Sequence, residues 1–401
     1  MTERLYYSNS SLTEFEAAVV EATTTEDGRH AVLLDRTAFY PTSGGQPSDT
    51  GLLGDARVID VVDREDGAIL HVVDRPLSVG AGVRGHVDWV RRFDHMQQHT
   101  GQHVLSAAFD RVAGVPTVSF HLGELSSTID LAREISARDV EGAEDEANRV
   151  VWADRPVTIR FADAEEVARL PLRKASRREG TLRLVEVTDV DLSACGGTHV
   201  ASTGVIGIIA IASTERFRGG TRVEFVCGGR ALRAHRSLRD LVAASVKVLS
   251  VGPGELPAAI ERLQAEGRDT RRQSKELQSR LAVHEAEALV TSGERVGDVS
   301  YAIAALEGWD ASGLKQLASA VASKPRQGAI LLSLPPPSAL VVAHAPGVGV
   351  DSGAVLKRMV ARFGGKGGGR PELAQGGGLE GSVEEMLAFA RATVREALGA
   401  S

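Results

Sequence analysis

Short apolar runs separated by turn residues fill the first 90 positions of the chain. The runs AVLLD, ARVIDVV and AILHVVD are rich in β-branched residues, and Asp66-Gly67 and the stretch PTSGGQPSDTG supply turn signals between them. Many short strands within so few residues are typical of a small barrel or sandwich. We therefore predict a β-barrel-like N-terminal domain over residues 1–90.

The apolar pattern changes to helical spacing at Phe93. Apolar side chains then recur three and four residues apart until Gly114 and Pro116 end the segment. Two strand-like stretches (TVSFHL and STIDLA), a helix over about 137–153 and further strand and helix patterns follow. This mixture predicts a central α+β domain over residues 91–230.

The rest of the chain divides into a helical part and an alternating part. Residues 231–295 carry few strand signals and are rich in Arg, Glu, Gln, Leu and Ala, so we predict a helical connector. Over 296–401, apolar runs such as GAILLSL and ALVVAHA alternate with helical patterns, which predicts a C-terminal α/β domain. The stretch GGKGGGRPELAQGGG between its last two helices is predicted to be a loop. The chain is thus expected to be a multidomain α+β protein.

Composition places the chain among ordinary globular proteins. Of its 401 residues, 43% are hydrophobic and 25% charged, which excludes a disordered chain or a collagen, and two cysteines exclude a disulfide scaffold. No apolar run approaches the ~20 residues that span a bilayer, and the N-terminus does not resemble a signal peptide. We expect a cytoplasmic protein without a membrane partner. The net charge of −7 argues against an overall coat of nucleic acid but allows a local basic groove.

Candidate metal ligands stand in two motifs, HTGQH and CGGTH. His99 and His103 are four residues apart on the predicted helix, so both imidazoles lie on one face, a turn apart. Cys195 and His199 flank two glycines that favour a turn, in which thiolate and imidazole can converge. Three histidines and a cysteine form a ligand set that suits tetrahedral Zn²⁺. The alternative is that two surface histidines and a buried cysteine coincide by chance.

Three further segments contain residues that could take part in chemistry. Cys227 stands on an apolar strand and is interpreted as a core residue. The tripeptide ending at Gln46 (GGQ) could bring a backbone near an ester, but a tight turn is favoured. In the glycine-rich stretch, Lys366 and Arg370 accompany glycines whose N–H groups could approach an anion, so we predict that they contact phosphate or a nucleic-acid backbone.

These motifs together resemble a known family. HTGQH followed by CGGTH resembles the zinc signature of the alanyl-tRNA synthetase editing domain, which also occurs in stand-alone alanyl-tRNA editing proteins of the AlaX type. AFYPTSGGQPSDTG is similar to the segment that precedes this domain in both groups. GGKGGGRPELAQGGG resembles the C-terminal domain of alanyl-tRNA synthetases, which is shared with DHH phosphoesterases. Because nothing like an aminoacylation domain precedes the barrel-like residues, the chain resembles the long stand-alone form.

The resemblance implies a trans-editing hydrolase acting on tRNA(Ala) that is mischarged with serine or glycine. It also implies Zn²⁺ held by His99, His103, Cys195 and His199. A synthetase pocket for alanine excludes serine poorly, whereas a second site that hydrogen-bonds the hydroxyl can reject the alanine ester by ~10⁴ or more. The candidate substrate-binding residues beside the zinc are Gln102, Thr117, Ser119, Gly196 and Gly197.

The sequence leaves several alternatives open. Four protein ligands usually mark a structural zinc, so a catalytic ion would need a ligand to yield to water or a larger coordination number. Otherwise the ion positions the substrate. A tRNA-binding protein with a structural zinc and a DHH-like phosphoesterase acting on oligonucleotides are the rival functions, although no Asp-His-His triplet supports the second. A homodimer through the C-terminal half is a further open alternative.

Overall fold

The computed structural model describes residues 2–174 and 180–399. The chain divides into two compact units, Met1–Ala244 and Ser245–Ser401, and each is described by itself. Among the described residues, every helix is either too short or too polar to cross a lipid bilayer. The α+β class is confirmed, because both units combine helices with sheets.

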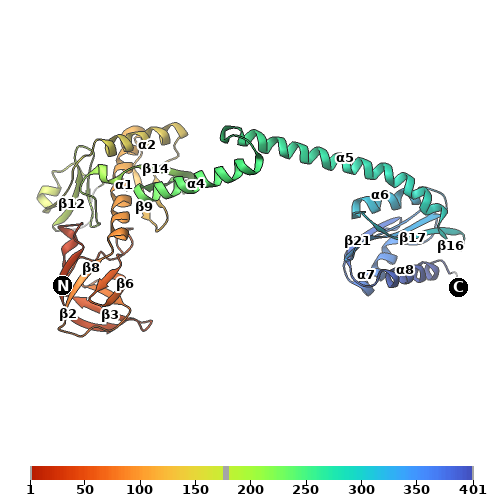
Figure 1. Ribbon diagram of the computed structural model, residues 1–401, viewed down its shortest axis with the longest axis horizontal. Helices are drawn as coiled ribbons and strands as arrows, with labels where there is room; N and C mark the ends of the chain where they lie inside the picture. The colour runs from red at the N-terminus through yellow and green to blue at the C-terminus, as the bar shows by residue number, and fades with distance from the viewer. Residues whose placement is uncertain (1, 175–179, 400–401) are drawn as a thin grey trace. The chain divides into compact units, whose positions relative to one another are not determined.

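The first unit begins with a closed six-stranded barrel, which confirms the predicted β-barrel (Figure 1). Along its first strand, buried and exposed residues alternate, and Phe15, Ala17 and Val19 point into the barrel core. In pairing order, the strands are β2 (Glu14–Thr24), β3 (His30–Leu34), β7 (Ile69–Val73), β6 (Ala56–Asp63), β5 (Gly51–Leu53) and β8 (Gly82–Val87). Beside the barrel lie β1 (Glu3–Arg4), η1 (Leu5–Tyr7) and β4 (Arg36–Thr37).

Helix α1 (Trp89–Ala113) leads from the barrel into the middle of the unit (Figure 1). The Asp88 side chain accepts hydrogen bonds from two N–H groups at its start, and Gly114 ends it with a left-handed φ of 62°. Every residue from His95 to Phe109 is buried. Because most buried polar groups find a partner inside a protein, a polar atom of this stretch that lacks one stands out.

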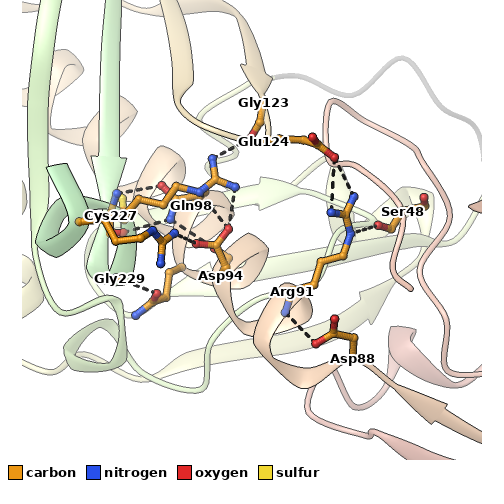
Figure 2. Close-up of polar contacts among 12 residues, drawn as sticks. Ser48, Asp88, Arg91, Asp94, Gln98, Gly123, Glu124, Cys227 and Gly229 are labelled. Atoms are coloured by element: carbon orange, nitrogen blue, oxygen red, sulfur yellow. Dashed lines mark hydrogen bonds and ion pairs between the residues drawn. The ribbon is translucent and has the colours of Figure 1, made fainter. Parts of the chain in front are cut away.

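Polar side chains of α1 fix the helix to elements on both sides of it (Figure 2). Arg91 donates from Nε to the Ser48 carbonyl oxygen of the barrel at 2.8 Å. Gln98 exchanges two hydrogen bonds with the main chain of Cys227, at 3.1 and 2.8 Å. Cys227 is fully buried, as predicted for a core residue.

A fully buried ion pair also joins α1 to the barrel. Neither Arg92 nor Asp49 has any exposed side-chain surface. Arg92 Nε lies 3.0 Å from both carboxylate oxygens of Asp49, and its Nη1 donates to the Ser10 carbonyl oxygen at 2.7 Å. Asp49 also accepts a hydrogen bond from the Tyr40 N–H at 2.6 Å. These contacts hold three segments of the N-terminal part against one helix.

Two sheets complete the first unit. A four-stranded antiparallel sheet packs with α1 and α2 around one apolar core, and a three-stranded antiparallel sheet stands beside it. The first contains β14 (Ile209–Phe217), β15 (Gly220–Cys227), β10 (Ser127–Leu131) and β9 (Thr117–Leu122), and the second β11 (Val157–Ala162), β12 (Leu182–Val187) and β13 (Asp191–Ala194). The helical segments are α2 (Ala137–Trp152), α3 (Ala164–Val167), η2 (Thr203–Ile206) and α4 (Gly228–Leu249).

The second unit is a six-stranded sheet with helices on both faces (Figure 1). Only β17 and β18 pair in parallel, so the predicted α/β alternation produces a mostly antiparallel sheet. In order, the strands are β16 (Glu294–Val296), β17 (Val299–Glu307), β18 (Gln327–Leu334), β19 (Ser338–His344), β21 (Leu373–Leu379) and β20 (Lys366–Arg370). An apolar core lies on each face of the sheet. The first contains α6 (Ala311–Ala322) and the end of α5 (Leu256–Thr291), a helix that follows η3 (Pro253–Glu255). The second contains α7 (Ser352–Phe363) and α8 (Val383–Ala397).

The glycine-rich stretch is a strand pair, so the predicted loop is wrong. β20 and β21 form an antiparallel hairpin at the edge of the sheet. A Cβ on Gly367 would lie 2.5 Å from the Cα of Gly376, and one on Gly369 would lie 2.3 Å from the Cα of Ala374. The glycines therefore allow two strands to approach closely, which explains a composition that otherwise indicates a loop.

Candidate metal centre

The four predicted ligands lie together in the first unit. His99 and His103 come from α1, Cys195 directly follows β13, and His199 ends the CGGTH turn. One donor atom from each residue lies within 4.8 Å of the others. The Cys195 Sγ is 3.3 Å from the Nε2 of both His99 and His199. The two motifs are far apart in sequence but form one compact cluster.

Each histidine of the cluster is held at its Nδ1 atom by a different partner. His99 Nδ1 lies 2.8 Å from the Gln46 Oε1, His103 Nδ1 lies 2.7 Å from Asp191, and His199 Nδ1 lies 3.1 Å from the Thr100 hydroxyl oxygen. Partners of this kind hold the proton on Nδ1 and leave the Nε2 lone pair free for a metal. Three Nε2 atoms and one sulfur atom fit the tetrahedral N₃S set that Zn²⁺ takes.

The charges around the cluster also suit a cation. Burial raises the pKa of the Cys195 thiol, but the neighbouring His99 and His199 lower it well below its usual range. Burial likewise raises the pKa of Asp191, yet its bonds and charge interactions with His103 and Arg173 lower the value to about 2. The cluster therefore contains a thiolate and an adjacent ionised carboxylate.

Close packing explains Gly197 of the turn but not Gly196. A Cβ on Gly197 would lie 2.1 Å from the His99 ring and 2.9 Å from the Gln46 Oε1. A Cβ on Gly196 would lie 3.6 Å from the Tyr7 hydroxyl oxygen, so this residue faces the N-terminal segment. Gly197 thus has a structural reason to be glycine beside its predicted role in substrate binding.

A cavity of about 660 Å³ opens beside the cluster. It is lined by three of the ligands and by all five predicted substrate-binding residues: His99, His103, Cys195, Gln102, Thr117, Ser119, Gly196 and Gly197. A larger and more open hollow of about 920 Å³ lies on the barrel, and none of the predicted site residues lines it. The cavity beside the ligands is therefore the candidate site.

Polar side chains on the cavity wall differ in whether all their buried polar atoms have hydrogen-bond partners. Gln102 Nε2 and Thr117 Oγ1 both donate to the Ser106 hydroxyl oxygen at 2.8 Å. Ser119 donates to Asp130 at 2.6 Å. The Gln102 Oε1 is buried and has no partner among the described residues. Gln102 therefore lines the cavity and carries a buried acceptor that is unused.

Sequence reasoning missed the groups that orient the ligands. Gln46 does stand in a tight turn, since the main chains of Ser43 and Gln46 exchange two hydrogen bonds, but its side chain also holds His99. Asp191 stands in no recognisable motif, and Thr100 lies within HTGQH, where its contact with His199 was not predicted. Lys366 and Arg370 lie at the two ends of β20, and both are exposed. Their proposed contact with nucleic acid stays a prediction.

Replacing Gln46 by methionine is expected to weaken zinc binding about 10- to 100-fold, because the His99 ring loses the acceptor that fixes its tautomer. Competition with a chromophoric chelator measures this affinity. Gln102→Met is the matched control, since Gln102 bonds Ser106 and no ligand. Equal zinc affinities of wild type and Gln46→Met would contradict the assigned role.

Three known sequence families match parts of the chain. A model of the tRNA synthetases of class II (A) matches residues 2–91, and one of the threonyl and alanyl tRNA synthetase second additional domain matches residues 182–224. The DHHA1 domain matches residues 298–396. The C-Ala domain structure from Aquifex aeolicus alanyl-tRNA synthetase covers 26% of this chain and 96% of that chain, with 23% identity and a TM-score of 0.24.

Full-length relatives fall into two groups. The alanine–tRNA ligases of Pyrococcus abyssi and Natronomonas pharaonis are 33% and 36% identical over 94% and 100% of this chain. The chain spans less than half of their length, 42% and 44% respectively. The alanyl-tRNA editing protein AlaX-L of Pyrococcus horikoshii is 32% identical over 99% of this chain and 100% of its own length. The chain therefore belongs to the family of the alanyl-tRNA editing protein AlaX-L.

Proposed function

We propose that the protein is a trans-editing hydrolase that deacylates tRNA(Ala) mischarged with serine or glycine, with Zn²⁺ as its cofactor. The observation that carries the proposal is the cavity, which combines a metal-ligand cluster with an unpartnered polar acceptor. Membership of the AlaX-L family supports alanyl-tRNA editing as the activity. We place this activity in the cytoplasm.

Gln102 is proposed to recognise the substrate side chain. Its Oε1 has no partner, so a serine hydroxyl in the cavity would donate to it. An alanine ester has no such donor and would leave the acceptor buried and unpaired, which costs about 1–3 kcal/mol for one neutral group. Thr117 and Ser119 support this wall through their bonds to Ser106 and Asp130.

The side chains around the ligands keep the site ordered. When bound by the cluster, Zn²⁺ supplies a positive charge at one end of the cavity. Gln46, Asp191 and Thr100 hold the imidazole Nδ1 atoms, so the Nε2 atoms keep their directions before substrate enters. The closed set of four ligands keeps a purely structural zinc in a tRNA-binding protein as the alternative.

The second unit is proposed to contribute RNA contacts and self-association. Lys366 and Arg370 are exposed at the ends of β20, where both charges can meet phosphates. On α5, Leu263, Leu277 and Leu281 are exposed and share a heptad spacing. This seam supports the proposed homodimer through the C-terminal half.

The test is a deacylation time course on Ser-, Gly- and Ala-tRNA(Ala), with metal content measured on the same preparation. We expect the serine ester to be hydrolysed about 10- to 100-fold faster than the alanine ester, because one buried acceptor is left unpaired, and chelation of zinc to stop the reaction. Binding of tRNA(Ala) without deacylation would favour the structural-zinc alternative. Cleavage of oligonucleotides with Mn²⁺ would favour a phosphoesterase.

A further inference from the structure

One row of residues crosses the three-stranded sheet and ends at the metal cluster. Phe161 of β11 is the direct register partner of Arg183 of β12. On the other side of Arg183, the Cys195 N–H donates to the Arg183 carbonyl oxygen at 3.1 Å, directly after the register pair Leu184–Ala194. Residues directly opposite each other share a face of a sheet. Phe161, Arg183 and Cys195 all line the cavity.

Arg183 is a buried cation that is only partly satisfied. The residue is 7% exposed. Its Nε donates to the Tyr7 carbonyl oxygen at 2.9 Å, and its Nη1 donates to the Cys195 carbonyl oxygen at 2.6 Å. Its Nη2 has no partner among the described residues, and no carboxylate among them forms an ion pair with it. The opposite charge that acts on Arg183 is the Cys195 thiolate, which also belongs to the ligand cluster. The buried Nη2 atom without a partner points to a further acceptor at this position.

Phe161 is unusual because it is an apolar side chain that is exposed. All ten phenylalanines are in the described part of the chain, and Phe161 is the exposed one, at 52%. Its ring stands on the cavity wall next to Arg183. An exposed aromatic ring beside a cationic donor is the combination that proteins use to stack a base and hold a phosphate.

A structural role explains these residues only in part. Holding the carbonyl oxygens of Tyr7 and Cys195 accounts for two nitrogens of Arg183, and the guanidinium lies over the Tyr7 ring, but neither contact accounts for Nη2. Core packing does not account for Phe161, because about half of its surface is in solvent.

We propose that Phe161 and Arg183 form the subsite for the last nucleoside of an RNA strand. The base stacks on the Phe161 ring, and the phosphodiester that precedes it accepts a hydrogen bond from Arg183 Nη2. Neighbouring strands are about 4.8 Å apart, so Arg183 lies one strand and Phe161 two strands from the ligand Cys195. This order places the ribose and its aminoacyl ester toward the cluster. The inference rests on the proposed function, and it specifies how the last nucleoside of the RNA substrate is bound.

The first test changes Phe161, which is exposed and can be replaced without opening the core. Phe161→Ala is expected to raise the KM for Ser-tRNA(Ala) about tenfold and to leave kcat unchanged, because stacking on one base is lost. Phe161→Trp should restore the wild-type KM. Trp152→Ala is the matched control, since Trp152 is 70% exposed and does not line the cavity. An unchanged KM in Phe161→Ala, or a lower kcat only, overturns the subsite.

The second test measures binding and does not depend on hydrolysis. The probe is an uncharged RNA hairpin of the tRNA(Ala) acceptor stem, with either adenosine or an abasic ribose at its 3′ end. Wild type is expected to bind the adenosine hairpin about tenfold more tightly, and Phe161→Ala to bind both equally. Because the test compares the affinities for the two hairpins, any contact that the second unit makes with both hairpins does not affect the result. Equal binding of both hairpins by the wild type overturns the assignment of Phe161.

A third hairpin tests Arg183 without altering the protein. It carries a neutral methylphosphonate in the linkage before the last nucleoside, and a matched hairpin carries it two linkages earlier. We expect the first change to weaken binding to wild type about tenfold and the second to weaken it little, because Arg183 meets only the last linkage. Equal losses overturn the role of Arg183. If wild type leaves Ser-tRNA(Ala) intact but binding follows these expectations, the proposed function fails and the subsite stands.

Discussion

Replacing Cys195 by alanine is expected to remove zinc and to lower deacylation of Ser-tRNA(Ala) by at least about 10²-fold. The thiolate is the only sulfur donor of the cluster, and its Sγ lies 3.3 Å from two imidazole Nε2 atoms. Without it, three imidazoles remain to hold a doubly charged ion. Metal content by mass spectrometry and the deacylation rate are measured on the same preparation.

The other cysteine provides the matched control. Cys227 is fully buried on β15, and burial raises the pKa of its thiol above the usual range, so it stays protonated. Cys227→Ala removes one buried sulfur and is expected to cost about 1 kcal/mol of stability while zinc content stays unchanged. Unchanged zinc and rate in Cys195→Ala would remove the cluster from the proposed function.

Replacing Asp49 by alanine is expected to lower the free energy of unfolding of the first unit by about 3–5 kcal/mol. The substitution leaves the Arg92 guanidinium buried without its carboxylate, and it removes the acceptor of the Tyr40 N–H. The pair joins α1 to the barrel, so the loss should appear in both elements. Because α1 also holds His99 and His103, zinc affinity should fall as well.

The measurement must separate the two units, since a chain of two compact units need not unfold in one step. We therefore suggest urea unfolding with a pulse of hydrogen exchange, read in peptides from α1, the barrel and β17–β19. Peptides of the first unit should lose protection at lower urea in Asp49→Ala, and those of the second unit should not change. A uniform shift in all peptides would contradict the local role of the pair.

An exposed ion pair of the same barrel is the control for Asp49→Ala. Glu14 and Arg84 join β2 and β8, and their side chains are 51% and 72% exposed. Glu14→Gln is expected to change the free energy of unfolding far less than Asp49→Ala, because solvent already screens the pair. Equal losses in Glu14→Gln and Asp49→Ala would show that burial does not set the energy of these contacts.

The sequence predicted those parts of the molecule that local pattern determines. Short β-branched runs separated by turn signals predicted the barrel, and HTGQH with CGGTH predicted which four side chains would meet. Both results follow from local sequence, since turn residues separate strands and a helix brings residues four apart onto one face. The metal itself and the substrate roles of Gln102, Thr117 and Ser119 stay predictions.

The parts that could not be predicted depend on contacts between distant segments. Gln46 holds His99 from 53 positions away, and Asp191 holds His103 from 88 positions away. No local pattern marks such partners, because each depends on how the barrel and β13 pack against α1. The prediction of a loop over the glycine-rich stretch was wrong because its composition, taken alone, indicates a loop. The close packing between β20 and β21, which explains the glycines, is visible only in the structure.

The distance between the two halves of the ligand cluster also determines when a newly made chain could enclose a metal ion. A ribosome adds about 5–20 residues per second, so Cys195 is made roughly 5 to 20 seconds after His99, which lies 96 positions earlier. During this interval the nascent chain presents histidines without their thiolate. A metal ion could therefore be bound by all four ligands only after translation has passed His199. It would then cross-link α1 to the CGGTH turn and close the long loop of chain between them.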